Sequence, residues 1–174
     1  MHWGMGLSVL GCFVFVQAAQ QVDPKDPAKK EFMSMGKGDL MFYHKSFGTL
    51  AAGLLVPRLV VRAISKNPPS FSKMFAEKLI ADVSHTIMYG MLIAMPVTGV
   101  AMGYYGGKGL PFFTTTIPGA SDDDKDGKLA GQAFKLHKQI GWYMELLFLG
   151  HIGGVAMHTI RGHPILARII PGLK

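Results

Sequence analysis

Charged side chains are scarce in this sequence of 174 residues, and their scarcity argues against a soluble domain. Asp, Glu, Lys and Arg together make up 17% of the chain, whereas a soluble domain usually carries about a quarter. Hydrophobic residues make up 49%, and the mean hydropathy is +0.26. The charges gather in short blocks between long uncharged stretches, a pattern typical of a membrane protein with several spans.

Two other features are almost absent. The single cysteine, Cys12, lies in an apolar run and has no partner, so the chain contains no disulfide framework. A basic stripe interleaved with aromatic residues is also missing, although the formal net charge is +7. Lys and Arg flank the apolar segments, where they are expected to meet anionic headgroups. We therefore expect membrane lipids and no nucleic acid among the partners.

Four apolar segments are long enough to cross a hydrocarbon core of about 30 Å as helices. They cover about residues 2–20, 40–62, 79–105 and 129–160, and polar connections at 21–39, 63–78 and 106–128 separate them. The first segment lacks the basic start and the cleavage pattern of a signal peptide. The sequence therefore predicts an all-α protein, a transmembrane up-and-down four-helix bundle that forms a single membrane domain over residues 1–174.

The connection 106–128 contains an acidic stretch that partly resembles a calcium-binding loop. Asp122, Asp124, Asp126 and Gly127 match positions 1, 3, 5 and 6 of such a loop, but position 12 is Ala133. The bidentate glutamate that this position requires is therefore missing. We interpret the stretch as a solvated loop.

Seven histidines are present, and their spacing is informative. His137 and His151 are fourteen residues apart in the fourth segment, so they lie within about 40° of one helix face and about 21 Å apart along the axis. In an up-and-down bundle, His44 starts the second segment on the side of His137, and His2 starts the first on the side of His151. The topology thus predicts two pairs, His44–His137 and His2–His151, with His158 as the rival of His151.

Paired imidazoles at two heights favour haem. Imidazole is neutral near physiological pH and is a strong iron ligand. Two histidines fill both axial positions of a haem and leave no open site for oxygen, which favours an electron carrier. Histidines within a membrane also serve in transition-metal sites and proton pathways, and a single one can be a hydrogen-bonded packing residue. The complementary heights on three segments favour haem over these alternatives.

These residues resemble the signatures of the bacterial-type cytochrome b561 family, a diverse group of four-span, di-haem membrane proteins. The resemblance covers nearly the whole chain. It rests on four motifs, one per segment: His2-Trp3, His44-Lys45-Ser46-Phe47-Gly48, Met95-Pro96-Val97-Thr98-Gly99, and the series His137, His151 and His158. There are two departures. Family members usually have a short segment before the first histidine, and Glu145 in the middle of a span is unusual.

The resemblance implies that two haem b groups are ligated by four histidines: His2, His44, His137 and His151. It also implies that Gly48 makes room for the macrocycle. His85 matches a family histidine that is not normally an axial ligand, so it contacts a propionate or a quinol, or serves in packing. Lys45 contacts a propionate or reaches the membrane interface. His158 remains a second candidate for the haem of His2.

The function implied by the resemblance is electron transfer across a membrane. The donor or acceptor would be a quinol or quinone such as ubiquinone, or superoxide, and the membrane a bacterial inner membrane or a mitochondrial inner membrane. An alternative is a membrane subunit, with or without haem, of a larger respiratory or dehydrogenase complex; a homodimer is a further arrangement. A haem-free structural or metal-transport protein is the third hypothesis.

Overall fold

The computed structural model describes residues 2–66, 74–170 and 172. Four long helices dominate it: α1 (His2–Gln21), α2 (Lys37–Ile64), α3 (Phe75–Tyr105) and α4 (Gly127–Ile160). Each is long and apolar enough to cross a membrane. The prediction of an all-α transmembrane four-helix bundle is thereby confirmed. The expected connection 63–78 contains residues 67–73, which lie outside the described residues.

Side-chain caps start two of the helices. The Asp126 carboxylate accepts a hydrogen bond from the Leu129 amide at 2.8 Å and caps α4. The Asp39 carboxylate accepts one from the Gly36 amide at 3.1 Å at the start of α2. These carboxylates satisfy amide groups that have no partner within the helix itself. Asp126, which matched a calcium-loop position in the sequence, therefore has a structural task.

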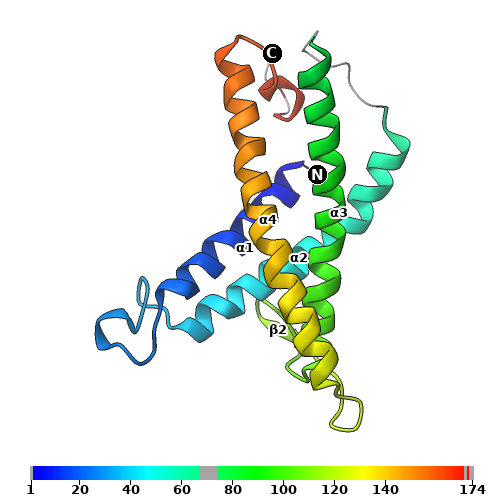
Figure 1. Ribbon diagram of the computed structural model, residues 1–174. Coiled ribbons are helices and arrows are strands. Elements are labelled where there is room, and N and C mark those ends of the chain that lie inside the picture. Colours follow the sequence, from blue (N-terminus) through cyan, green and yellow to red (C-terminus); the bar gives the residue numbers. More distant parts are fainter. Residues whose placement is uncertain (1, 67–73, 171, 173–174) are drawn as a thin grey trace.

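The helices form two hairpins that cross each other. α1 packs along α2, and α3 packs along α4, whereas the contact between the two hairpins is smaller. Figure 1 shows α1 and α2 running obliquely past α3 and α4. Within the first hairpin the approach is close, because a Cβ added at Gly11 would lie 2.7 Å from the Phe47 ring. Small residues at such points let membrane helices come together.

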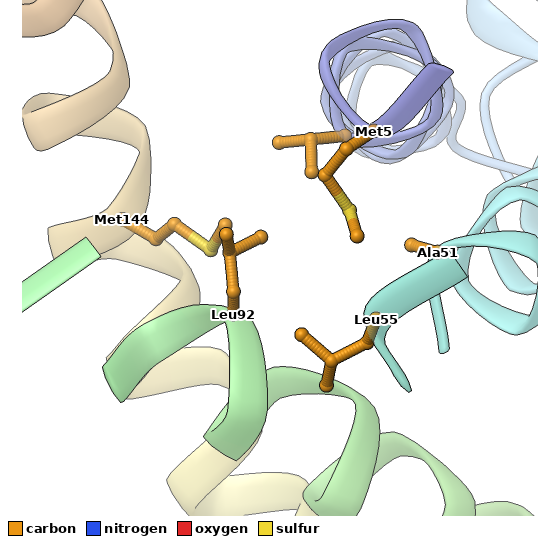
Figure 2. Packing of buried hydrophobic residues seen from close by; sticks show 6 residues of the cluster. Met5, Ala51, Leu55, Leu92 and Met144 are labelled. Atoms are coloured by element: carbon orange, nitrogen blue, oxygen red, sulfur yellow. The ribbon is translucent and has the colours of Figure 1, made fainter. Parts of the chain in front are cut away.

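The core that joins the hairpins is small. It consists of six buried residues that come from all four helices: Met5, Val9, Ala51, Leu55, Leu92 and Met144. Figure 2 shows Leu92 and Met144 on the α3–α4 side of this core and Met5, Ala51 and Leu55 on the α1–α2 side. Residues of all four helices also line a cavity of about 450 Å³. Many large apolar side chains are exposed instead, as a lipid-facing surface requires. The interior between the hairpins is therefore only partly filled by side chains.

A short β-hairpin follows α3, an element that the sequence did not lead us to expect. β1 (Leu110–Phe112) pairs antiparallel with β2 (Thr115–Ile117). Gly107 and Gly109 precede it with φ of +66° and +69°, a conformation that suits glycine. The Phe113 amide donates a hydrogen bond of 3.0 Å to the hydroxyl of the fully buried Ser46 on α2. This bond ties the hairpin to the start of α2.

The C-terminal segment folds back onto the start of α1. The indole Nε1–H of Trp3 donates a hydrogen bond of 2.7 Å to the carbonyl of Ile169, next to a short 3-10 helix, η2 (Leu166–Arg168). Arg161 pairs with Glu77 on α3 at 2.8 Å. The segment therefore lies at the end of the bundle where α1 begins, beside α3.

Candidate functional site

The first histidine pair joins the two hairpins. The rings of His44 on α2 and His137 on α4 have centroids 6.2 Å apart and planes at 85°. His44 Nδ1 lies 2.9 Å from the Cys12 carbonyl oxygen, which can only accept a hydrogen bond. The Nδ1–H of His44 therefore donates to it, and the lone pair of the ring is on Nε2.

The partner ring is held in the same way. His137 Nδ1 lies 2.9 Å from the Thr98 hydroxyl. That hydroxyl donates its own hydrogen to the carbonyl of Ala94 at 2.8 Å or of Met95 at 3.0 Å. It must then accept from His137 Nδ1–H, which leaves Nε2 of this ring free as well. Both imidazoles of the first pair are thus in the tautomer that a metal ligand needs.

A cavity of about 450 Å³ surrounds this pair. Besides the two rings, its lining includes Lys45, Gly48, Gly99 and Lys108. A Cβ at Gly99 would lie 3.4 Å from His137 Cε1, so the glycine gives the ring its space. The size and the apolar lining with a few polar groups are typical of a cofactor pocket.

The second pair is His2 on α1 and His151 on α4, with ring centroids 6.3 Å apart. The adjoining cavity is small, about 70 Å³, and Arg58 lines it together with both histidines. The His85 ring lies 5.5 Å from His151 at 82° and donates from Nδ1 to the Ala81 carbonyl at 2.7 Å. His85 is therefore a neighbour of the second pair.

Both pairs have the donors and the spacing that suit haem iron. Bonds from a metal to imidazole nitrogen are about 2 Å, so two rings on opposite sides of one iron have centres about 6 Å apart. The observed separations of 6.2 and 6.3 Å agree with this value. The residues also fit a haem better than a bare metal ion, since no group of three or more His, Cys, Asp or Glu converges in the described part of the chain.

The structure separates the rival histidines. His158 Nδ1 lies 2.9 Å from Nδ1 of His163, with ring centroids 5.1 Å apart, so it pairs with the C-terminal segment. His151, and not His158, lies opposite His2. Lys45 and Gly48 both line the first cavity.

Sequence reasoning missed three features of these sites. The Cys12 carbonyl could not be found from residue types, because any residue supplies one. Thr98 stands within the motif Met95–Gly99, yet its contact with His137 depends on how α3 packs against α4. Arg58 had a signal, an ionisable side chain inside an apolar segment, which usually marks function.

Two polar features lie outside the cavities. Glu145 accepts hydrogen bonds on both carboxylate oxygens from Gln17 Nε2 at 2.8 Å, which links α4 to α1.

In the acidic loop, Lys125 hydrogen-bonds the exposed Asp122 and holds the pKa of that carboxyl below its ordinary value. The loop is therefore internally paired at the surface, in line with the interpretation as a solvated loop.

Four membrane-spanning helices with histidine pairs at two levels define the class of four-helix membrane cytochromes. A family model described as prokaryotic cytochrome b561 matches residues 1–172. The chain belongs to the prokaryotic cytochrome b561 family. It is an integral membrane protein that binds haem b and transfers electrons. A comparison with individual curated proteins gives no match.

Proposed function

We propose that the chain holds two haem b groups, one between His44 and His137 and one between His2 and His151, and carries electrons between a quinol and a partner across the membrane. The observation that supports this most strongly is the nearly equal ring separation of the two pairs, 6.2 and 6.3 Å. The fourteen-residue interval between His137 and His151 sets the two pairs at different heights.

Haem b supplies reversible one-electron oxidation and reduction. The protein's residues hold and insulate it. The hydrogen bonds of His44 and His137 orient both rings and raise their basicity as ligands. Val9, Leu92 and Met144 line both cavities, so a thin apolar layer separates the two sites. This layer keeps water out of the space between them.

Polar groups at the first cavity suit the edge of a haem. Lys45 and Lys108 line the cavity and carry the charge that pairs with propionates. Gly48 adds no side chain to this wall; a Cβ there would lie 3.9 Å from Cys12 Sγ. We assign Lys45 and Gly48 to the first haem on these grounds.

A quinol such as ubiquinol is the proposed electron donor, with superoxide as the second candidate. A quinol gives up two protons with its two electrons, so a proton acceptor is needed near its point of entry. His85 is exposed beside the second pair, and His158 lies at the end of α4 with His163. We propose His85 as the quinol contact and the second pair as the entry point.

A membrane subunit of a larger respiratory complex is the alternative. The described connections between the long helices carry one 3-10 helix, η1 (Pro27–Lys29), and a short β-hairpin, which are too small for a catalytic domain. Native gel electrophoresis of gently solubilised membranes distinguishes the two. Migration with a large assembly would favour the subunit, and a monomer or homodimer would favour the independent carrier.

A spectrum of the purified protein with a quantified haem content tests the proposed function. We expect a reduced-minus-oxidised spectrum with the α-band of haem b, two haems per chain, and reduction of both by an ubiquinol analogue. One haem per chain would contradict the two-site arrangement. Haem that is reduced by dithionite but not by the quinol would contradict the proposed donor, and superoxide would then be tested in its place.

A further inference from the structure

A half-buried arginine lines the second cavity, and one of its donor groups is buried without a hydrogen-bond partner among the described residues. Arg58 lies on α2 and lines this cavity beside His2 and His151. Its Nε–H is buried and makes no hydrogen bond to a described residue. Nearly all buried polar groups in folded proteins have a partner, because an unpaired one loses its hydration without compensation. The unpaired donor therefore indicates that an acceptor enters the cavity with a ligand.

The position of Arg58 on its helix relates it to the second histidine pair. Arg58 follows His44 by fourteen residues on α2, just as His151 follows His137 by fourteen on α4. This interval keeps two side chains within about 40° of one helix face and moves about 21 Å along the axis. Arg58 thus stands on the face of α2 that carries His44, but at the height of His151.

Tyr89 on α3 leaves the edge of the guanidinium available. Its ring centroid lies 5.4 Å from Arg58 Cζ, a distance at which an aromatic ring interacts with the cation. This interaction leaves the Nε–H itself without an acceptor. The Nε–H and one terminal N–H of a guanidinium form a planar fork that matches the two oxygens of a carboxylate.

The described lining of the second cavity contains no acidic side chain. Apart from Arg58 and the two histidines, it consists of glycine and of apolar side chains such as Met5, Met88 and Phe148. A carboxylate brought by the ligand would pair this cation and complete the site.

We propose that Arg58 binds a propionate carboxylate of the haem held by His2 and His151, an inference that rests on the proposed function. Arg58 is then a positioning residue of the second site. It orients the macrocycle from α2 while α1 and α4 supply the axial ligands. Because a nearby cation offsets the negative charge of the propionate, it also raises the reduction potential of this haem.

The test compares Arg58→Gln with Arg62→Gln in the purified haem-loaded protein. Arg62 is a matched control, because it lies one turn further along α2 and its Cζ is 6.0 Å from the same Tyr89 ring, but it is outside the cavity lining. The measurements are haem per chain, a spectroelectrochemical titration and the propionate bending band in the resonance Raman spectrum. The His44–His137 haem in the same molecule serves as the folding control.

We expect Arg58→Gln to lower the midpoint potential of one haem component and to shift one propionate band, with the other component unchanged. Arg62→Gln should leave both components as they are. Arg58→Lys keeps the charge but loses the planar fork, so it should shift the propionate band with a smaller change in potential. If the Arg58→Gln variant does not fold, the propionate band in the Raman spectrum of Arg58→Lys still tests the inference.

The outcomes distinguish this inference from the proposed function. If the protein binds two haems per chain and both Arg58 variants behave like Arg62→Gln, the role of Arg58 is wrong. The proposed two-haem function then still stands. A single haem in the unchanged protein, lost on His44→Ala, would contradict the two-haem function and the ligand of Arg58 together. A propionate shift that appears only in the two Arg58 variants would support the inference.

Discussion

The two histidine pairs have the same spacing but different surroundings. Their ring centroids are 6.2 and 6.3 Å apart. The first pair adjoins a cavity of about 450 Å³, and the second one of about 70 Å³. In the first pair both Nδ1 atoms are anchored, to the Cys12 carbonyl and to the Thr98 hydroxyl. The second pair is instead flanked by other rings, those of Trp3 and His85.

In the proposed two-haem arrangement, this difference corresponds to two ways of preparing a cofactor site. At the first pair the backbone and a threonine set the tautomer and orientation of each ligand before anything binds, which lowers the cost of binding. At the second pair the rings have the right separation, but the cavity that Met5 and Phe148 help to line is only about 70 Å³. Binding there requires these side chains to move. We therefore expect the first site to retain its haem more firmly.

Removing one axial ligand from each pair should have the largest effect and tests this comparison directly. We expect His137→Ala to lose the haem of the first site and His151→Ala that of the second, each leaving about half of the haem b. The measurement is haem per chain with the spectrum of the remaining component. His158→Ala is the control and should keep both, because His158 pairs with His163. Loss of a haem in that control would instead identify His158 as a ligand.

Gly103→Ala should disturb the first site, because Gly103, Gly109 and Leu110 all line its cavity. An added Cβ would lie 2.6 Å from Leu110 Cδ2 and 2.9 Å from the Gly109 carbonyl oxygen, which belongs to the backbone and cannot move aside freely. Overpacking of this kind typically costs about 1–3 kcal/mol. Thermal release of haem, followed by absorbance, should occur earlier from the first site. Gly90→Ala, whose added Cβ has no atom within 4 Å, should behave as the unchanged protein.

Thr98→Val should loosen the first site by a moderate amount. The change keeps the shape of the side chain but removes the acceptor of His137 Nδ1–H. Loss of such an outer hydrogen bond typically costs about tenfold or more in metal affinity. Haem transfer to apomyoglobin measures the dissociation rate, which should rise for one component. The same substitution at Thr86, whose hydroxyl bonds the Asp82 carbonyl at 2.8 Å, should leave both rates unchanged.

Trp3→Phe should have the smallest effect and concerns only the second site. It removes the hydrogen bond of 2.7 Å from the indole to the Ile169 carbonyl. An exposed hydrogen bond contributes about 0.5–1.5 kcal/mol. Amide hydrogen exchange should quicken in residues 161–170 and stay the same in the β-hairpin. If exchange in residues 161–170 and in the β-hairpin changes equally, the hydrogen bond of Trp3 does not stabilise the C-terminal segment locally.

The sequence was sufficient for much of the fold, because the bilayer restricts the options. Apolar runs of about twenty residues can cross it only as helices. The expected segment 79–105 corresponds to α3 (Phe75–Tyr105), and 129–160 to α4 (Gly127–Ile160). The helices extend beyond the apolar runs, and their first turns include polar residues such as Lys37 in α2 and Glu77 in α3. The β-hairpin at Leu110–Ile117 was not predicted, because strands of three residues are too short to show an alternating pattern.

The candidate sites were likewise predicted from the sequence only in part. Helical periodicity is local, so the interval from His137 to His151 by itself determined that both imidazoles share a face of α4 at two heights. Which partner each ring meets depends on how the hairpins cross. The up-and-down topology predicted the pairs His44–His137 and His2–His151 but left His158 as a rival of His151. Only the tertiary structure decided that His151 faces His2 and that His158 lies beside His163. The tertiary structure also brought the Cys12 carbonyl to His44 and Arg58 to the second cavity. These contacts join different helices, so a pattern within one helix does not predict them.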